Sequence, residues 1–283
     1  MEKITMKLLI CTQVVDKDDP VLGFFVRWIE EFQKHCEVEV ISLKDLGRGG
    51  RLLRTWRLLR CASTGRYDAV FVHMNPEYLV AAGWLWKLRG KKTGLWYTHK
   101  SVDLKLRVAE KFADVIFTAS KESFRLPSKK VRVMGHGIDT DFFCPDPGVV
   151  RTAHLLSVGR LMPSKRHDLA IREAARMGKD LRIAGEGPER KNLEALAQKL
   201  GARVQFLGPL TQVQLRDEYR RAALLIHRSE TGSLDKVVLE AAACGLPVDT
   251  TDPALAALPL SPQYVREHHS LKNLIPAILK ALA

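Results

Sequence analysis

Short apolar runs alternate with amphipathic helical stretches along most of the 283 residues, and no other feature constrains the fold as strongly. Continuous, β-branched strands separated by helices are typical of a parallel sheet that is covered on both faces. The first half therefore predicts a doubly wound α/β domain, with ligand groups at the carboxyl ends of its strands. Strands are predicted at Lys7–Gln13, Glu37–Leu43, Ala69–Asn75, Thr93–His99, Asp114–Ser120 and Lys130–Met134, and helices at Phe24–His35, Arg51–Cys61, Glu77–Arg89 and Val102–Phe112.

The same alternation restarts after Gly148. The stretch before it, 137–148, is rich in Gly, Pro and Asp and suits a hinge. The length also allows two domains, so we expect an acceptor-side domain over residues 1–145 and a second α/β domain over 146–283. Its strands are predicted at Ala153–Val158, Leu181–Ala184, Val204–Leu207, Ala223–His227 and Pro247–Thr250, and its helices at Asp168–Met177, Glu189–Leu200, Thr211–Ala222, Lys236–Ala243 and Leu271–Leu282.

Composition narrows the protein class. No apolar run approaches the roughly 18–20 residues of a membrane span, and the first residues lead into a strand without a cleavable signal. The five cysteines are an odd number and form no C-x-x-C pair, which argues for reduced thiols and against a zinc or disulfide framework. We therefore expect a cytoplasmic protein. The net charge of +13 is spread over both halves, which argues against a nucleic-acid-binding arm.

One segment concentrates basic residues. Six arginines and no acidic residue occur between Gly47 and Arg66. A helix over Arg51–Cys61 would gather Leu52, Leu53, Trp56 and Leu59 on one side. Two interpretations are compatible: a layer helix that packs its leucines on the sheet, or a helix that contacts an anionic membrane surface or an acidic acceptor at the inner face of the membrane.

Two cations follow the first strand of the second half. The run Leu155–Gly159 reads as a buried strand that ends in glycine. Arg160 comes directly after it, and Lys165 follows five positions later. Fixed cations at the carboxyl end of a strand suit a pyrophosphate, because charge-assisted hydrogen bonds are about twice as strong as neutral ones. Taken alone, the same pair also fits two solvated surface cations.

Several ordered motifs resemble one family. Ser157–Arg160 with Lys165, Ala184–Glu189, Phe206–Gly208 and Val237–Pro247 follow the order and spacing of the family 4 retaining glycosyltransferases, and Met134–Phe143 resembles their linker. The resemblance implies the GT-B architecture, in which two Rossmann-like domains face each other, and a short member of the family. The first domain would face the acceptor, and the second would bind a nucleotide diphosphate sugar.

The resemblance also implies roles for particular residues. Arg160 and Lys165 would hold the donor diphosphate and stabilise the leaving group, so that no metal is required, and Glu240 would accept hydrogen bonds from the ribose. His99 would lie against the donor sugar as a further catalytic group, and Gly23 would lie in the diphosphate or acceptor loop. The expected donor-binding residues are Gly159, Arg160, Lys165, Gly185, Gly187, Gly208, Gly232, Ser233, Leu234, Asp235, Val238, Leu239 and Glu240.

The chain departs from the family pattern in the sugar-binding loop. Gly232 stands where family members carry the first of two glutamates. Backbone N–H groups of 231–236 can serve a phosphate or sugar hydroxyl instead. Asp235 fits either this donor site or the N-cap of the following helix.

These features together predict retaining transfer of a hexose from a nucleotide diphosphate sugar to an acceptor hydroxyl. A lipid-linked precursor and a polysaccharide precursor are candidate acceptors. No cofactor is expected beyond the donor co-substrate. A nucleotide-sugar epimerase of the same fold and a non-catalytic sugar-nucleotide-binding subunit stay as alternatives. After Pro247 little sequence is left for a long closing helix that returns to the first domain, so we expect domain closure that is looser or that relies on a partner or membrane.

Overall fold

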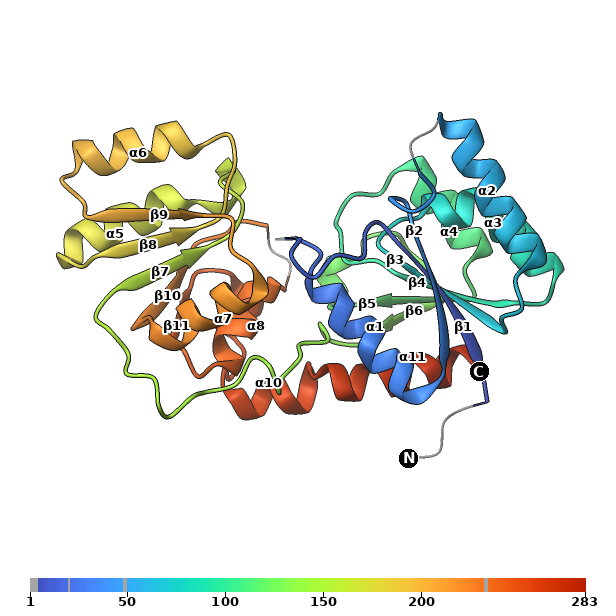
Figure 1. Cartoon of the computed structure of the whole chain (residues 1–283). Coiled ribbons are helices and arrows are strands. Elements are labelled where there is room, and N and C mark those ends of the chain that lie inside the picture. Colours follow the sequence, from blue (N-terminus) through green and yellow to red (C-terminus); the bar gives the residue numbers. More distant parts are fainter. Residues whose placement is uncertain (1–4, 20, 48–49, 232–233) are drawn as a thin grey trace. The chain divides into compact units, whose positions relative to one another are not determined.

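The computed structural model describes residues 5–19, 21–47, 50–231 and 234–283. The chain forms two compact units (Figure 1). The first unit contains the strand Lys7–Thr12, residues Val21–Gly137 and the final segment Leu271–Ala283. The second unit contains Ile138–Ser270.

The first unit is built on a six-stranded parallel sheet with the order β2-β1-β3-β4-β5-β6. Apolar side chains point alternately to its two faces, because successive residues of a strand face opposite sides. One buried cluster joins Leu9 and Val70 to α2, α3 and α4, and the other joins Leu8 and Phe71 to α1 and α11. The elements are β1 (Lys7–Thr12), α1 (Phe24–His35), β2 (Glu37–Ser42), α2 (Arg51–Thr64), β3 (Ala69–His73), α3 (Glu77–Leu88), β4 (Lys92–Trp96), α4 (Leu104–Phe112), β5 (Val115–Thr118), the 3-10 turn η1 (Lys121–Ser123) and β6 (Val131–Val133).

The last helix, α11 (Leu271–Leu282), belongs to the first unit. Its buried residues Leu274, Ile275 and Ile278 join the cluster that contains Trp28 of α1. The expectation that too little chain remains for such a helix was therefore wrong, and the predicted division at residues 145 and 146 does not follow the two units. The amphipathic pattern of α11 predicted a helix correctly, but a pattern does not specify which sheet a helix covers.

Helix α2 packs with a different face from the one predicted. Its inward positions are Thr55, Leu58, Leu59 and Ala62, with the i, i+3, i+4, i+7 spacing of a helix face. The other apolar residues point outward, since Leu52 is 88% exposed and Leu53 and Trp56 are exposed as well. The interpretation as a layer helix that packs its leucines on the sheet is confirmed for Leu58 and Leu59 and was wrong for Leu52 and Leu53.

The second unit holds a five-stranded parallel sheet with the order β11-β10-β7-β8-β9. From β7 the chain moves outward through β8 and β9 and then returns to place β10 on the other side of β7. The strand order therefore reverses between β7 and β10, and ligands of open α/β sheets bind at the carboxyl ends beside such a point. The elements are β7 (Leu155–Val158), the 3-10 turn η2 (Pro163–Lys165), α5 (His167–Met177), β8 (Leu181–Ala184), α6 (Arg190–Lys199), β9 (Val204–Gly208), α7 (Gln212–Arg221), β10 (Leu224–His227), α8 (Lys236–Ala243), β11 (Val248–Thr250), α9 (Pro253–Ala256) and α10 (Pro262–His268).

Each predicted strand and helix is present, with bounds that shift by a few residues at most. The doubly wound parallel class is confirmed for both sheets. The sequence missed the short helices α9 and α10, whose first turns begin with a proline next to a polar N-cap. Within the described part of the chain, the structure contains no helix with the length and apolar character of a membrane span.

Candidate functional site

The turn after β7 is built around Gly159 and Leu161. Gly159 has a φ of +150°, which allows the chain to turn sharply at the end of the strand. Leu161 is fully buried, and its backbone N–H donates to the Glu186 carbonyl at 2.9 Å. Arg160 lies between these two anchors, so its backbone is fixed beside the reversal of the strand order.

The turn after β8 packs directly against this one. A Cβ at Gly185 would lie 2.0 Å from the Gly159 carbonyl oxygen, and one at Gly187 would lie 2.4 Å from the Leu161 carbonyl oxygen. Both positions therefore require glycine. The two predicted donor-loop glycines bring the turns after β7 and β8 together.

The two predicted cations have different surroundings. The Arg160 side chain is exposed, and within the described chain no acidic group pairs with it. Lys165 has 19% of its side chain exposed, and its Nζ donates to both carboxylate oxygens of Asp235 at 2.9 and 2.7 Å. The structure thus presents one available cation and one that a carboxylate already holds.

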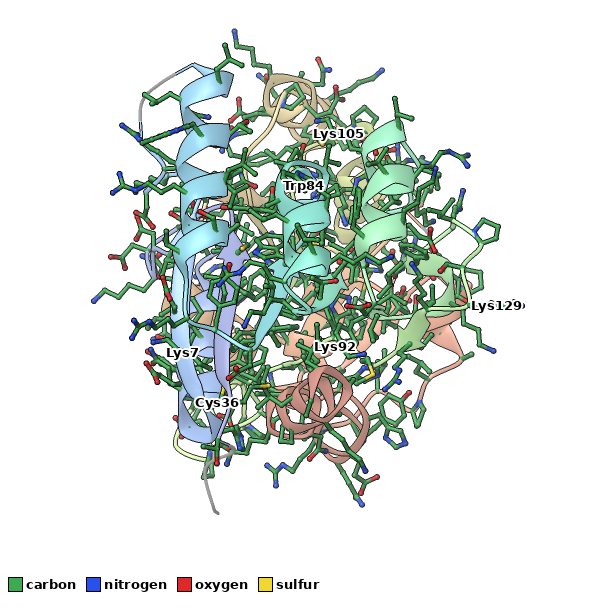
Figure 2. All side chains as sticks on the ribbon, turned by 90° about the vertical axis from the view of Figure 1, so that its right-hand side faces the viewer. Lys7, Cys36, Trp84, Lys92, Lys105 and Lys129 are labelled. Carbon is green, nitrogen blue, oxygen red and sulfur yellow. The ribbon has the colours of Figure 1, made fainter. Side chains whose placement is uncertain are left out.

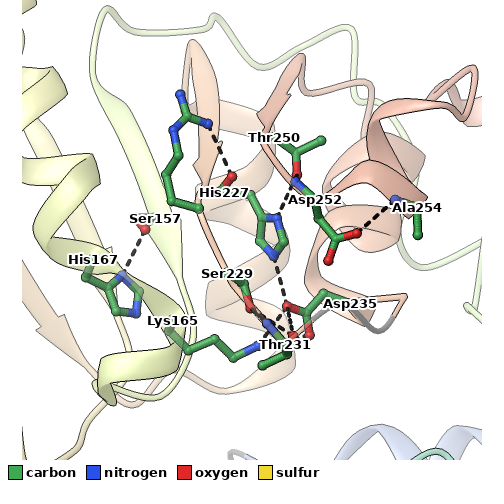
Figure 3. A network of polar contacts seen from close by, with 11 residues as sticks. Ser157, Lys165, His167, His227, Ser229, Thr231, Asp235, Thr250, Asp252 and Ala254 are labelled. Carbon is green, nitrogen blue, oxygen red and sulfur yellow. Dashed lines mark hydrogen bonds and ion pairs between the residues drawn. The ribbon is translucent and has the colours of Figure 1, made fainter. Parts of the chain in front are cut away.

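Asp235 is the centre of a polar network that joins three segments (Figure 3). Besides Lys165, its Oδ2 is 2.9 Å from Nε2 of His227, at the end of β10. The other ring nitrogen, Nδ1, is 2.9 Å from Thr250 Oγ1 at the end of β11. An ionised carboxylate only accepts, so Nε2 carries the proton that His227 donates to Asp235. The network therefore links Lys165, which follows β7, to the ends of β10 and β11, on the other side of the point where the strand order reverses.

The charge of Asp235 follows from these partners. Burial alone would raise the pKa of the carboxyl, but the hydrogen bond from His227 and the positive charge of Lys165 outweigh burial. The pKa of Asp235 consequently lies well below its ordinary value, and the group is ionised at neutral pH. Asp235 occupies the N-cap position of α8, yet its side chain accepts no hydrogen bond from that helix. The interpretation as a helix cap alone was wrong.

A buried histidine lies next to the turn that follows β7. His167 is 3% exposed, and its Nδ1 is 2.9 Å from Ser157 Oγ on β7. Burial lowers the pKa of His167 to about 4, and the charge of Lys165 acts in the same direction. His167 is therefore neutral at physiological pH and adds no third charge beside the two cations.

The chain is similar to known protein families and to several known relatives. Residues 150–257 match the family model described as "Glycosyl transferases group 1". The second unit is a group 1 glycosyltransferase domain. A D-inositol 3-phosphate glycosyltransferase from Mycobacterium sp. (strain JLS) is 34% identical over 149 residues, which cover 47% of this chain and 34% of that protein. The gpi3 subunit of a phosphatidylinositol N-acetylglucosaminyltransferase from Schizosaccharomyces pombe is 33% identical over 135 residues, which cover 44% of this chain and 30% of that protein. The match thus spans about a third of the length of these relatives.

Solved structures extend the likeness in fold to nearly the whole chain. The Anabaena protein HepE, solved with UDP and glucose, aligns with a TM-score of 0.69 and 17% identity over 98% of this chain and 95% of that one. AviGT4, a glycosyltransferase involved in avilamycin A biosynthesis, aligns with a TM-score of 0.69 and 15% identity over 98% of this chain and 97% of that one. The expected GT-B fold is confirmed.

Within the glycosyltransferase domain, Glu240 is buried with only 2% of the residue exposed. Its Oε1 accepts from Lys236 Nζ at 3.0 Å, and its Oε2 accepts from the Tyr219 hydroxyl at 3.3 Å. These bonds fix the carboxylate near the first turns of α8. The predicted role of Glu240 towards a ribose stays a prediction.

Other predicted donor residues of this domain are placed as follows. Gly208 ends β9 with a φ of +70°, beside an irregularity in the pairing of β8 with β9. Leu234, Val238 and Leu239 are buried in the core cluster of α7 and α8, so their side chains serve packing. Gly232 and Ser233 lie outside the described residues.

His99 and Gly23 belong to the first unit and not to the glycosyltransferase domain. His99 is exposed, and its Nδ1 accepts from the backbone N–H of Ser101 at 3.1 Å. Gly23 is the N-cap of α1 with a φ of −55°, a conformation open to any residue. The roles predicted for both stay predictions.

Sequence reasoning missed His227 and Thr250 as members of the site, and it considered only the backbone of Thr231 and not its hydroxyl. Thr231 Oγ1 lies 3.5 Å from Asp235 Oδ2 and 2.9 Å from Ser229 Oγ. His227 did give a signal, because it is the last residue of a predicted strand. That signal became meaningful only once β10 was known to lie beside β7.

Proposed function

We propose that the chain is a retaining glycosyltransferase that moves a hexose from a nucleotide diphosphate sugar to an acceptor hydroxyl without a metal ion. The observation that supports this most is the position of Arg160 and Lys165 at the carboxyl end of β7, beside the reversal of the strand order. Positive groups fixed there can neutralise the charge that develops on the departing diphosphate. This is the chemistry that a metal ion supplies in other transferases.

Arg160 and Lys165 have separate tasks in this proposal. Arg160 is exposed and binds the diphosphate directly through its planar guanidinium. Lys165 is held by Asp235, so its ammonium is positioned before the donor arrives. Such preorganisation means that little reorganisation is needed when charge builds up on the leaving group.

Asp235 itself is a poor nucleophile. Its two oxygens accept hydrogen bonds from Lys165, and one of them also accepts from His227. A carboxylate held in this way is not available to attack the anomeric carbon. We therefore favour a same-face route, in which the acceptor oxygen attacks on the side that the diphosphate leaves and the departing phosphate accepts the acceptor's proton.

UDP-glucose is the first donor to test, because structures of the similar protein HepE contain UDP and glucose or UDP-glucose. The acceptor would be presented by the first unit. We place the enzyme in the cytoplasm, and the arginines and outward apolar residues of α2 support a peripheral position at an anionic membrane surface.

The deciding experiment measures nucleotide release from a panel of nucleotide sugars, with and without candidate acceptors. Arg160→Gln should weaken UDP binding by roughly 10- to 100-fold, because a charge-assisted hydrogen bond contributes about 1.5–3 kcal/mol. Arg172→Gln on α5 is the matched control, since Arg172 is also exposed. Equal UDP affinity in both variants would contradict the assignment.

The same panel separates the alternative functions. Release of nucleotide that depends on the acceptor supports transfer. Conversion of the donor sugar without acceptor supports an epimerase instead, and UDP binding without any turnover supports a non-catalytic subunit. Either of the last two results overturns the proposed transfer.

A further inference from the structure

A pocket lies in the first unit, away from the residues described so far. It has a volume of about 400 Å³, within the range of about 300–1,000 Å³ that small-molecule sites occupy. It lies where the first turns of α2, α3 and α4 meet the segment that follows β2. Most of its wall is apolar and is formed by Leu43, Leu46, Leu58, Tyr78, Val80 and Ala81.

The floor of this pocket reaches the sheet. The hydroxyl of Tyr78 donates to the Thr12 carbonyl at 2.8 Å and approaches the Ile41 carbonyl at 3.3 Å. Thr12 ends β1, and the strand order of this sheet reverses between β1 and β3. The pocket therefore adjoins the place where doubly wound sheets bind ligands.

The rim of the pocket is polar and mainly basic. Arg54, Thr55, Glu77 and Lys105 line it. Lys105 Nζ forms an ion pair with Glu77 at 2.7 Å. Arg54 has no carboxylate partner within the described chain, and its Nε donates only to the Gly47 carbonyl at 3.1 Å. The rim thus retains one uncompensated positive charge beside an apolar interior.

Several apolar side chains on the three helices that line the pocket are exposed to solvent. Leu52 on α2 is 88% exposed and Leu104 on α4 is 76% exposed. Trp56 on α2 and Trp84 on α3 are about half exposed. Figure 2 shows the helix of Trp84 between the two neighbouring helices, with Lys105 on the same face. Exposed apolar side chains on the helices that form a pocket favour an interaction site, since their contact with water is unfavourable.

We propose that this pocket binds the hydrocarbon chain of an anionic amphiphile, with the phosphate or carboxylate head group at Arg54. An apolar interior suits the chain, the arginine suits the anion, and the exposed leucines and tryptophans suit the rest of a lipid. Resting on the proposed function, this identifies the acceptor class as an anionic lipid. It also explains why α2 turns Leu52 and Trp56 outward.

The test uses calorimetric titration of the full chain with dodecyl phosphate below its micelle concentration. Inorganic phosphate and dodecanol are titrated separately, to measure the contributions of head group and chain. We expect saturable one-to-one binding of dodecyl phosphate and much weaker binding of the other two. Binding of inorganic phosphate as tight as that of dodecyl phosphate would overturn the proposal.

Two pairs of variants localise the binding. Ala81→Trp fills the pocket and should weaken binding by at least roughly tenfold, whereas Leu88→Trp lies on the same helix outside the pocket and should not. Arg54→Gln should weaken binding by roughly tenfold, whereas Arg60→Gln on the same helix should not. Because the arginine pair changes only surface side chains, it decides the question even if Ala81→Trp fails to fold. Equal affinities within the arginine pair would overturn the proposal.

Two further measurements distinguish binding in the pocket from adsorption to a membrane surface and from binding at the donor site. Phosphatidylglycerol vesicles that bind while monomeric dodecyl phosphate does not would indicate adsorption to a membrane surface, and would overturn the pocket. UDP titration of Arg160→Gln reports on the donor site in the other unit. UDP affinity that is unchanged in Arg160→Gln contradicts the proposed donor site alone, whereas dodecyl phosphate affinity that is unchanged in Arg54→Gln contradicts the pocket alone.

Discussion

The ion pair between Lys165 and Asp235 makes a quantitative prediction about the second unit. The side chains are 19% and 16% exposed, and Nζ lies 2.9 and 2.7 Å from the two carboxylate oxygens. Removing one partner of a buried pair costs about 3–5 kcal/mol, because the other charge stays buried. Since both groups keep some contact with water and His227 still donates to Asp235, we expect Lys165→Met to lower the free energy of unfolding by about 3 kcal/mol.

A double-mutant cycle isolates the pair. Asp235→Asn should cost about 2 kcal/mol, because an amide still accepts a hydrogen bond from Lys165. The double variant removes both charges, so it should lose about 3 kcal/mol and not the additive value of about 5 kcal/mol. The expected coupling energy is therefore about 2 kcal/mol.

The assay is urea unfolding at pH 7.5, followed by far-ultraviolet circular dichroism and by tryptophan fluorescence. Circular dichroism reports on both units. Fluorescence reports on the first unit alone, because it contains all five tryptophans, Trp28, Trp56, Trp84, Trp86 and Trp96. A variant that affects only the second unit should shift the circular dichroism transition more than the fluorescence transition.

The pH dependence has a definite sign. The pKa of Asp235 is lowered in the folded chain, so its stabilisation is present above the unfolded pKa of about 3.9 and is lost as pH falls through the folded pKa. The cycle is therefore measured where the pair is fully charged. A coupling energy below about 0.5 kcal/mol at pH 7.5 would refute the reasoning, since that value is within the error of additive, independent sites.

Three further predictions concern the glycosyltransferase domain. Gly185→Ala should cost about 3 kcal/mol in urea unfolding, because its Cβ would lie 2.0 Å from a carbonyl oxygen. Gly178→Ala, where a Cβ has no neighbour within 4 Å, should cost only about 1 kcal/mol, and equal losses would contradict the packing argument. Since the pKa of His167 is lowered to about 4, the unfolded chain binds the extra proton between pH 6.5 and 4. Stability should fall by about 3 kcal/mol across that window in the wild type, and His167→Gln should remove this part of the fall. Tyr219→Phe should cost about 1–2 kcal/mol, because it removes the hydrogen bond to the buried Glu240, and an unchanged unfolding midpoint would show that this bond contributes nothing.

The sequence predicted local structure well because periodicity depends on near neighbours. The bounds of α1, α8 and α11 agree with the prediction at both ends, and every predicted strand is present. The positions of Gly159 and Gly185 at strand ends were also visible in the sequence. Such features need only the alternation of residues along a strand or around a helix.

The sequence could not assign partners to these elements. The apolar stripe of α11 does not reveal that it covers the first sheet. Helix α2 has apolar residues on several sides, so the face predicted from its sequence was not the one that packs. Lys165 is tens of residues away from His227 and Asp235 in the sequence, and it meets them only because β10 lies beside β7.

The sequence by itself determined the two parallel sheets, the glycine turns and the position of two cations after one strand. The tertiary structure decided which cation is available, since Arg160 is exposed and Lys165 is bound to Asp235. It also decided which apolar residues of α2 face water. The physical reason is that helix and strand formation follow from the local pattern, whereas ion pairing and burial depend on distances between segments that only the folded chain brings together.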